Sequence, residues 1–198
     1  MKLLAFSDLH LDTDAADRIV AEAKSADLVI GAGDFAQART GLQAFMDRLA
    51  PIAEKAIYVA GNNESRDELR HATEATVLHG TSITWQGLVV AGIGGATPPL
   101  PPIPWDSWDL TEAQAETLLS GLPRADILIS HSPPHGVGDR HAKLGHIGSH
   151  AVRDAAIRLA PKYLFCGHVH DAWGATGMVH TTRVHNLGPT PNWFEIPT

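Results

Sequence analysis

The sequence has little cysteine and no long uninterrupted apolar run. Cys166 is the one cysteine among 198 residues, so the chain has no internal disulfide. Near the start of the chain the apolar run is only Leu3 to Phe6, shorter than the roughly 7–15 residues of a signal-peptide core. Residues 80–105 are uncharged, but glycine and proline interrupt them repeatedly, so we expect no membrane span. These absences predict a cytoplasmic protein.

Positive charge is also scarce. The chain has 15 Lys and Arg against 22 Asp and Glu, a formal net charge of −7 with histidine neutral. An acidic chain without a basic stripe argues against long nucleic acid or an anionic membrane surface as a partner. The length fits one domain, and we expect a single domain over residues 1–198. Nothing in the sequence indicates an oligomeric state.

Histidine, by contrast, is abundant. The chain has 12 histidines, as many as its five Phe, five Trp and two Tyr together. Imidazole binds metal ions and titrates near neutral pH. The excess therefore indicates a metal site or acid–base chemistry.

Short apolar runs alternate with helical patterns along the chain, which is typical of an α/β layered fold. We expect strands at residues 2–7, 28–30, 57–59, 82–85, 88–93, 127–129 and 163–165, with antiparallel strands at 176–186 and 193–196 in the tail. We expect helices at residues 13–24, 41–49, 111–120 and 149–160, and a short helix opened by a capping box at 65–68. Proline-rich residues 97–105 predict a stiff extended segment, which we interpret as a lid rather than as a docking site for a proline-recognising partner.

Five polar blocks come directly after expected strands, where open α/β sheets place their ligands. In order, they are Asp8-Leu9-His10, Gly33-Asp34, Gly61-Asn62-Asn63-Glu64, Ser130-His131-Ser132 and Gly167-His168-Val169-His170. Taken singly, the blocks have plain structural explanations, because Asp8 would cap the next helix and Asp34 would form a turn. The last block is the strongest single signal, since two histidines two residues apart after a strand have the spacing of metal ligands.

Together the five blocks resemble the pattern of the calcineurin-like metallophosphoesterase superfamily, in the same order and over residues 8–170. Residues 131–139 and the pair Gly148-Ser149 are also similar to its small archaeal and bacterial members, which lack added domains. The resemblance implies a four-layer α/β/β/α sandwich, in which two mixed sheets are flanked by helices. It also implies hydrolysis of a phosphoester, and we expect a phosphodiester of a small or nucleotide-like type.

The resemblance further implies two divalent metal ions and a ligand set for each. Asp8, His10 and His170 would hold one ion, Asn62, His131 and His168 would hold the other, and Asp34 would bridge them. These side chains offer oxygen and nitrogen but no thiolate, which favours Mn first, then Fe, Zn, Co or Ni, over a closed Cys-type zinc site. Two such ions would activate a water as hydroxide for in-line attack on phosphorus.

One position departs from the family pattern. Where the family has Gly-Asn-His, this chain has Asn63, and a carboxamide cannot act as an acid at neutral pH. Among the histidines near the blocks, His135 is our candidate for a substitute acid. We therefore expect catalytic roles for Asp34, Asn62, Asn63 and His135, and substrate contacts from Asn63, His135, Asp139 and Ser149.

The loops around the site are expected to shape a substrate cleft. We expect Pro98 to Pro104 and the loop from His135 to Ser149 to border the same cleft, with Trp105, Asp139 and Ser149 in its lining. The expected partner is a small phosphoester substrate.

Asn63 leaves open a second class of function, a binding scaffold that has kept the fold and lost turnover. A nuclease is a further alternative, which the net charge of −7 disfavours.

Overall fold

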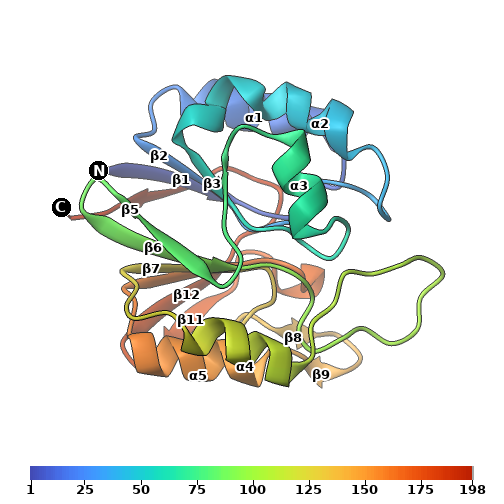
Figure 1. The fold of residues 1–198 in the computed structure, drawn as a ribbon, viewed down its shortest axis with the longest axis vertical. Helices are drawn as coiled ribbons and strands as arrows, with labels where there is room; N and C mark the ends of the chain where they lie inside the picture. The colour runs from blue at the N-terminus through green and yellow to red at the C-terminus, as the bar shows by residue number, and fades with distance from the viewer. Residues whose placement is uncertain (198) are drawn as a thin grey trace.

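Two β-sheets pack face to face between two layers of helices in the computed structural model, which describes residues 1–197 (Figure 1). The alternation of buried strands and amphipathic helices produces these layers, because each helix must bury its apolar side against a sheet. The predicted α/β/β/α sandwich of two mixed sheets is confirmed.

The first sheet contains four parallel strands and one antiparallel edge strand. Across the sheet the strands are β13 (Asn192–Glu195), β1 (Lys2–Phe6), β2 (Leu28–Gly31), β3 (Ala56–Tyr58) and β4 (Thr76–Val77). The central strands are continuous apolar runs because both faces of the sheet are covered. Its outer face carries α1 (Thr13–Ala23), α2 (Leu42–Leu49), α3 (Arg66–Ala72) and the 3-10 helix η1 (Ala50–Lys55).

The second sheet has four parallel strands with an antiparallel strand at each edge. Across the sheet the strands are β11 (Thr176–Val179), β12 (Thr182–Asn186), β10 (Tyr163–Cys166), β7 (Ile127–Ser130), β6 (Leu88–Ile93) and β5 (Thr81–Trp85). Its outer face carries α4 (Glu112–Ser120) and α5 (His150–Leu159). The remaining elements are a short hairpin, β8 (Arg140–His141) and β9 (Gly145–His146), and the 3-10 helix η2 (His170–Ala172).

The two sheets are held together by a layer of apolar side chains between them. Leu3, Ile30 and Ile57 of the first sheet face Ile129 and Phe165 of the second, and all five are almost fully buried. Each such side chain contributes roughly 1.5–3 kcal/mol when it leaves water. This packing fixes the carboxyl ends of the strands in both sheets relative to one another, which is where the polar blocks lie.

The helix starts agree with the capping patterns in the sequence. The capping boxes that begin at Ser65 and Thr111 are both formed. The cap of α1 is Asp12, which accepts hydrogen bonds from the N–H groups of Asp14 and Ala15 at 3.0 and 2.9 Å. Asp8 is therefore not a helix cap, and its carboxylate is available for the site.

One expectation about local structure needs correction. The tail strands do not form one antiparallel unit, because β11 and β12 pair within the second sheet whereas β13 pairs with β1 of the first. Gly188, with φ of +79°, allows the chain to turn from one sheet to the other. The expected end of a helix at residue 49 is confirmed, because α2 ends at Leu49. The chain continues as η1, where Pro51 lies in the first turn and its missing N–H costs nothing.

No helix among residues 1–197 is both long enough and apolar enough to cross a lipid bilayer.

Candidate metal centre

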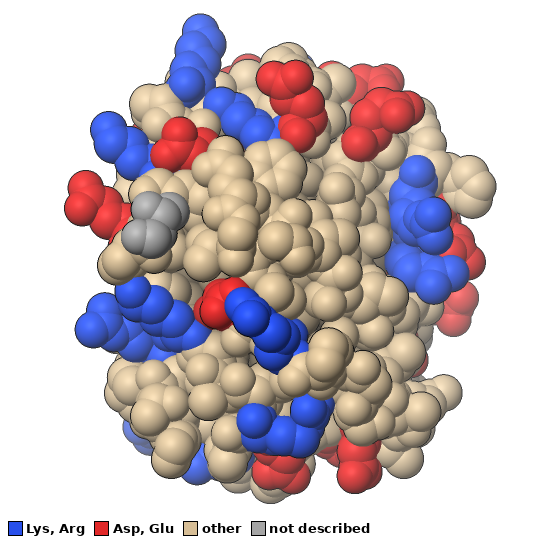
Figure 2. All heavy atoms as spheres, turned by 60° about the vertical axis from the view of Figure 1, so that its left-hand side comes forward, with Lys and Arg blue, Asp and Glu red and all other residues tan. Residues whose placement is uncertain are grey.

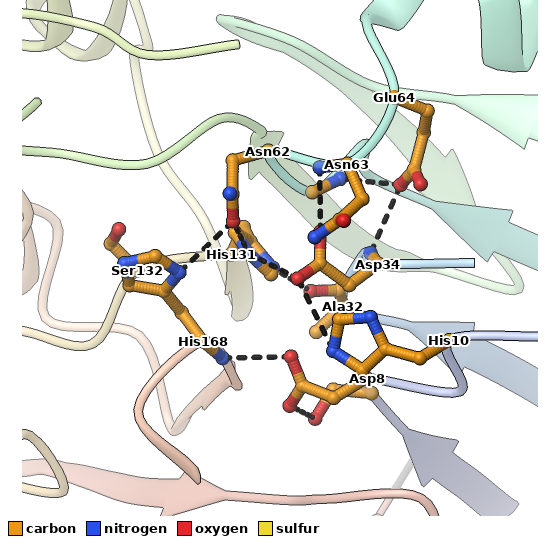
Figure 3. Close-up of polar contacts among 12 residues, drawn as sticks. Asp8, His10, Ala32, Asp34, Asn62, Asn63, Glu64, His131, Ser132 and His168 are labelled. Atoms are coloured by element: carbon orange, nitrogen blue, oxygen red, sulfur yellow. Dashed lines mark hydrogen bonds and ion pairs between the residues drawn. The ribbon is translucent and has the colours of Figure 1, made fainter. Parts of the chain in front are cut away.

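The five polar blocks meet at one edge of the sandwich, at the carboxyl ends of β1, β2, β3, β7 and β10. Backbone hydrogen bonds join the loops: the Asp8 N–H donates to the Gly33 carbonyl at 2.9 Å, and the Gly167 N–H donates to the His131 carbonyl at 3.0 Å. A third bond joins the two sheets, from the His168 N–H to Asp8 Oδ1 at 2.9 Å. Figure 3 shows side chains from both sheets gathered at this edge.

One group of ligand atoms combines two carboxylates with two imidazoles. Asp8, His10, Asp34 and His170 each place one such atom within 4.8 Å of the others. His10 Nε2 lies 3.5 Å from Asp34 Oδ2 and 3.1 Å from His170 Nε2. Nitrogen and oxygen atoms that converge in this way can surround a single divalent ion.

A second group lies on the other side of Asp34. It contains Asp34, His131 and His168, again with ligand atoms within 4.8 Å of one another. Asn62 Oδ1 completes the group, at 3.1 Å from both His131 Nε2 and His168 Nδ1. Asp34 belongs to both groups, which is the arrangement that a bridging carboxylate requires. The structure thus brings together all seven side chains that the sequence proposes as ligands.

Neighbouring hydrogen bonds orient these ligands. His131 Nδ1 lies 2.8 Å from the Ala32 carbonyl, an acceptor, so this nitrogen carries a proton and Nε2 faces the cluster. Asp8 Oδ2 accepts from the Ser7 hydroxyl at 2.6 Å and from the Trp173 indole N–H at 2.9 Å. The Trp173 ring also packs on the His170 imidazole, with centroids 4.4 Å apart. Sequence reasoning missed Trp173, which no motif marks.

The backbone at four of the ligands is strained. Asp8, His10, Asp34 and His168 have φ of +55°, +44°, +59° and +68°, a region that residues other than glycine seldom adopt. Each costs on the order of 1–3 kcal/mol and persists only where the surroundings enforce it. Such strain concentrates at functional sites, and here it is found at the ends of strands that present the ligands.

Glu64 binds the backbone of the two loops that carry Asp34 and Gly61. Its carboxylate accepts four backbone hydrogen bonds of 2.7–3.1 Å, from Asp34, Phe35, Ala36 and Gly61. Burial and the negative charge of Asp34 raise the pKa of Glu64 to about 7, and these donors oppose that rise. Gly61 has no space for a side chain, because a Cβ there would collide with the Asp34 carboxylate. The Gly-Asn-Asn-Glu block therefore positions Asp34 as well as supplying Asn62.

The charges of the site are strongly coupled. Burial would lower the pKa of His131, but the negative charge of Asp34 outweighs it and raises that pKa to about 9. Burial and the positive charge of His131 lower the pKa of His168 to about 3. Burial would raise the pKa of Asp34, yet attraction to His131 and His10 brings it far below its usual range. A bound cation must displace the His131 proton, so ion binding should weaken as the pH falls.

The residues present fit divalent ions. Two buried carboxylates, an amide oxygen and four imidazoles form the donor set, and Cys166, the one thiol, is buried with its Sγ 3.4 Å from the His185 carbonyl. His10 Nδ1 is buried and has no hydrogen-bond partner among the described residues. A set of hard and borderline ligands without thiolate suits metals that keep open positions for water or substrate.

A cavity of about 390 Å³ opens above the two ligand groups. Leu100 of the segment from Pro98 to Pro104 and His141 of the loop from His135 to Ser149 both line it, so the expectation that these two segments border one cleft is confirmed. Trp105, also expected in the lining, lies there too. Asn63 lines it as well. Sequence reasoning did not single out four other lining residues, which no motif marks: Gln37, Leu100, Ile147 and Asp171.

Three expected substrate contacts lie elsewhere. His135 is not in the lining and stacks on His150, with centroids 4.1 Å apart. The Asp139 carboxylate is buried and bound to the Gly136 and Gly148 N–H groups and to His146 Nδ1, so it organises its own loop. Ser149 is the buried cap of α5. The Ser149 hydroxyl donates to Glu112 of α4 at 2.9 Å and accepts the Val152 N–H of α5 at 3.1 Å. None of the three residues is therefore part of the cavity lining.

Fold and site together define a four-layer sandwich with a metal-ligand cluster at its carboxyl edge. The family model of the calcineurin-like phosphoesterase superfamily domain matches residues 1–194, and the chain belongs to this superfamily. A similar sequence is UPF0046 protein T07D4.2 of Caenorhabditis elegans, 28% identical over 111 residues that span 48% of this chain and 28% of that protein.

Solved structures share the fold. TT1561 of Thermus thermophilus superimposes with a TM-score of 0.72 at 21% identity, over 94% of this chain and 88% of that one. The phosphopantetheinyl hydrolase of Mycobacterium tuberculosis superimposes with a TM-score of 0.60 at 17% identity, over 95% of this chain and 90% of that one. A structure described as a novel archaeal phosphodiesterase superimposes with a TM-score of 0.54 at 16% identity, over 95% of this chain and 84% of that one.

Proposed function

We propose that the chain is a metal-dependent phosphoesterase that hydrolyses small phosphodiesters in the cytoplasm, with one divalent ion in each ligand group and manganese as the first ion to test. The observation that carries the proposal is the shared carboxylate, because Asp34 belongs to both groups and both open into one cavity. Ions of this kind, when bound, polarise phosphoryl oxygens and lower the pKa of a water nucleophile. Membership of the superfamily supports this reaction class.

The cavity favours water as the nucleophile. None of the described residues that line it is Ser, Thr or Cys, the side chains that most often form covalent intermediates. Of its carboxylate and imidazole groups, Asp34, His10, His168 and His170 would hold the ions. The other two, His141 and Asp171, lie 3.9 Å from each other. Direct attack by water on phosphorus therefore needs no covalent enzyme intermediate.

Asn63 contributes a hydrogen-bond donor rather than an acid. Its Oδ1 accepts the Ala38 N–H at 2.7 Å, and its backbone N–H donates to Asp34 Oδ1 at 2.9 Å. The amide Nδ2 is the polar group that remains for a phosphoryl or leaving-group oxygen. An amide donates a hydrogen bond but does not transfer a proton at neutral pH, so Asn63 gives the leaving group no acid assistance.

This chemistry predicts a steep dependence on the leaving group, which tests the function. Protein stripped of metal and reloaded with manganese should hydrolyse bis(4-nitrophenyl) phosphate faster than 4-nitrophenyl phosphate, and alkyl esters more slowly than aryl esters by about 10²–10⁴. Asn63→His should reduce that gap. His135→Ala is the control, because His135 lies outside the cavity lining.

The outcomes separate the two classes of function. A shallow dependence in all three proteins would contradict the role of Asn63, and a slope that steepens in His135→Ala would make His135 the acid. If none of Mn, Fe, Co, Ni or Zn supports hydrolysis of any ester, the chain is a binding scaffold. A role as a nuclease has less support, because no Lys or Arg occurs among the described residues that line the cavity. Figure 2 shows the side of the molecule away from the proline-rich segment, where Lys and Arg lie in separate groups among acidic residues.

A further inference from the structure

An apolar wall, made of Leu100, Trp105 and Ile147, forms part of the cavity lining. Leu100 and Trp105 come from the proline-rich segment, and Ile147 comes from the loop after β9. In Figure 1 the proline-rich segment projects beside the β8–β9 hairpin on the same side of the molecule. Trp105 is half-buried, so part of its ring is available to a molecule in the cavity.

This wall is anchored to a metal-ligand residue. Asn62 Nδ2 donates to the Ser107 hydroxyl at 3.0 Å, and that hydroxyl donates to Asp109 Oδ1 at 2.5 Å. Asp109 Oδ2 in turn accepts the Leu100 N–H at 2.9 Å. The Ser107 N–H also donates to the Trp105 carbonyl at 3.1 Å. These bonds join the proposed ligand Asn62 to both Leu100 and Trp105, so the fold sets the distance between the apolar wall and the ligand groups. A group that packs on the wall would be held at a defined position relative to the ions.

The cavity offers no permanent positive charge for a second anion. No Lys or Arg occurs among the described lining residues, and the acids that line it are Asp34 and Asp171. Arg39 is near the proline-rich segment, through a 3.4 Å bond to the Asp106 carbonyl, but it is paired with Glu68 at 2.8 Å. Proteins that bind additional phosphates use Arg or Lys for them. A second negative group would therefore meet Asp171 and no cation.

We propose that the substrate carries a single phosphoryl group esterified to a flat, uncharged aromatic group, and that Trp105 is the residue that selects this group. The inference rests on the proposed phosphoesterase function and names its substrate class. The phosphoryl group lies over the two ligand groups, and the aromatic group packs against Trp105, Leu100 and Ile147. The volume of about 390 Å³ suits one ring system beside a phosphate.

Binding of phosphonates, which are not hydrolysed, tests the proposal without relying on turnover. Manganese-loaded protein is titrated by calorimetry with methylphosphonate, phenylphosphonate and 4-carboxyphenylphosphonate, at a pH where all are fully ionised. Phenylphosphonate should bind about tenfold more tightly than methylphosphonate, because an aromatic contact is worth about one decade in Kd. The distal carboxylate should remove most of that gain.

Variants assign the effect to Trp105. Trp105→Ala should bring phenylphosphonate to the affinity of methylphosphonate, leave methylphosphonate unchanged and raise KM for aryl esters, whereas Trp105→Phe should keep most of the preference. Equal binding of the methyl and phenyl compounds, or tighter binding of the carboxylate, would overturn the proposal while hydrolysis of esters still supported the phosphoesterase. If no phosphonate binds and no ester is hydrolysed, the proposed function itself fails.

Discussion

Asp34→Asn is expected to lower kcat/KM for an aryl phosphodiester by about 10³-fold or more. Asp34 is the side chain common to both ligand groups, at 3.5 Å from both His10 Nε2 and His131 Nε2. The amide removes one negative charge from both groups at once. Metal ions at such sites contribute several kcal/mol to transition-state stabilisation, and each 1.4 kcal/mol corresponds to about tenfold in rate.

The same protein should also lose metal. Elemental analysis after manganese loading and gel filtration should show reduced occupancy in Asp34→Asn, with wild type and Asp47→Asn as references, since Asp47 is an exposed residue of α2. Full activity in Asp34→Asn, or full activity with one ion per chain, would contradict the shared role of this carboxylate.

Glu64→Gln is expected to destabilise the metal-free fold by about 3 kcal/mol or more. The carboxylate accepts four backbone N–H groups in the interior, and Glu64 is 1% exposed. A glutamine would turn an NH₂ group toward two of these donors, which leaves buried N–H groups without an acceptor at about 1–3 kcal/mol each. The loops that carry Asp34 and Gly61 would then separate.

Urea unfolding followed by circular dichroism measures this loss. Glu54→Gln is the matched control, because Glu54 is exposed in η1, and its change should stay within about 0.5 kcal/mol. Wild-type stability in Glu64→Gln would mean that the four hydrogen bonds do not hold the site together.

The layers and the ligands could be predicted because each depends on local pattern. Buried strands such as Leu28–Gly31 are continuous apolar runs, and a polar block after each one must lie at the sheet edge. The resemblance to the superfamily then assigned the blocks to one site. The helix starts at Ser65 and Thr111 could be predicted for the same reason, since a capping box is a pattern of only four consecutive residues.

The surroundings of the site depend on contacts between distant segments. Trp173 reaches Asp8 across 165 positions of sequence, and no motif announces that contact. Asp139 and Ser149 are polar residues in a glycine-rich loop, and the sequence does not tell whether such a side chain faces a pocket or its own backbone. β13 pairs with β1 because the chain turns at Gly188 from one sheet to the other. The local sequence does not determine which sheet such a strand joins.

Two manganese ions should share Asp34, and crystallography with anomalous scattering at saturating manganese can locate both of them. The expected result is two anomalous peaks about 3.5–4 Å apart on either side of the Asp34 carboxylate. One peak should contact Asp8, His10 and His170, and the other Asn62, His131 and His168. A single peak, with the His131 and His168 rings turned away from it, would show that Asp34 does not bridge two ions.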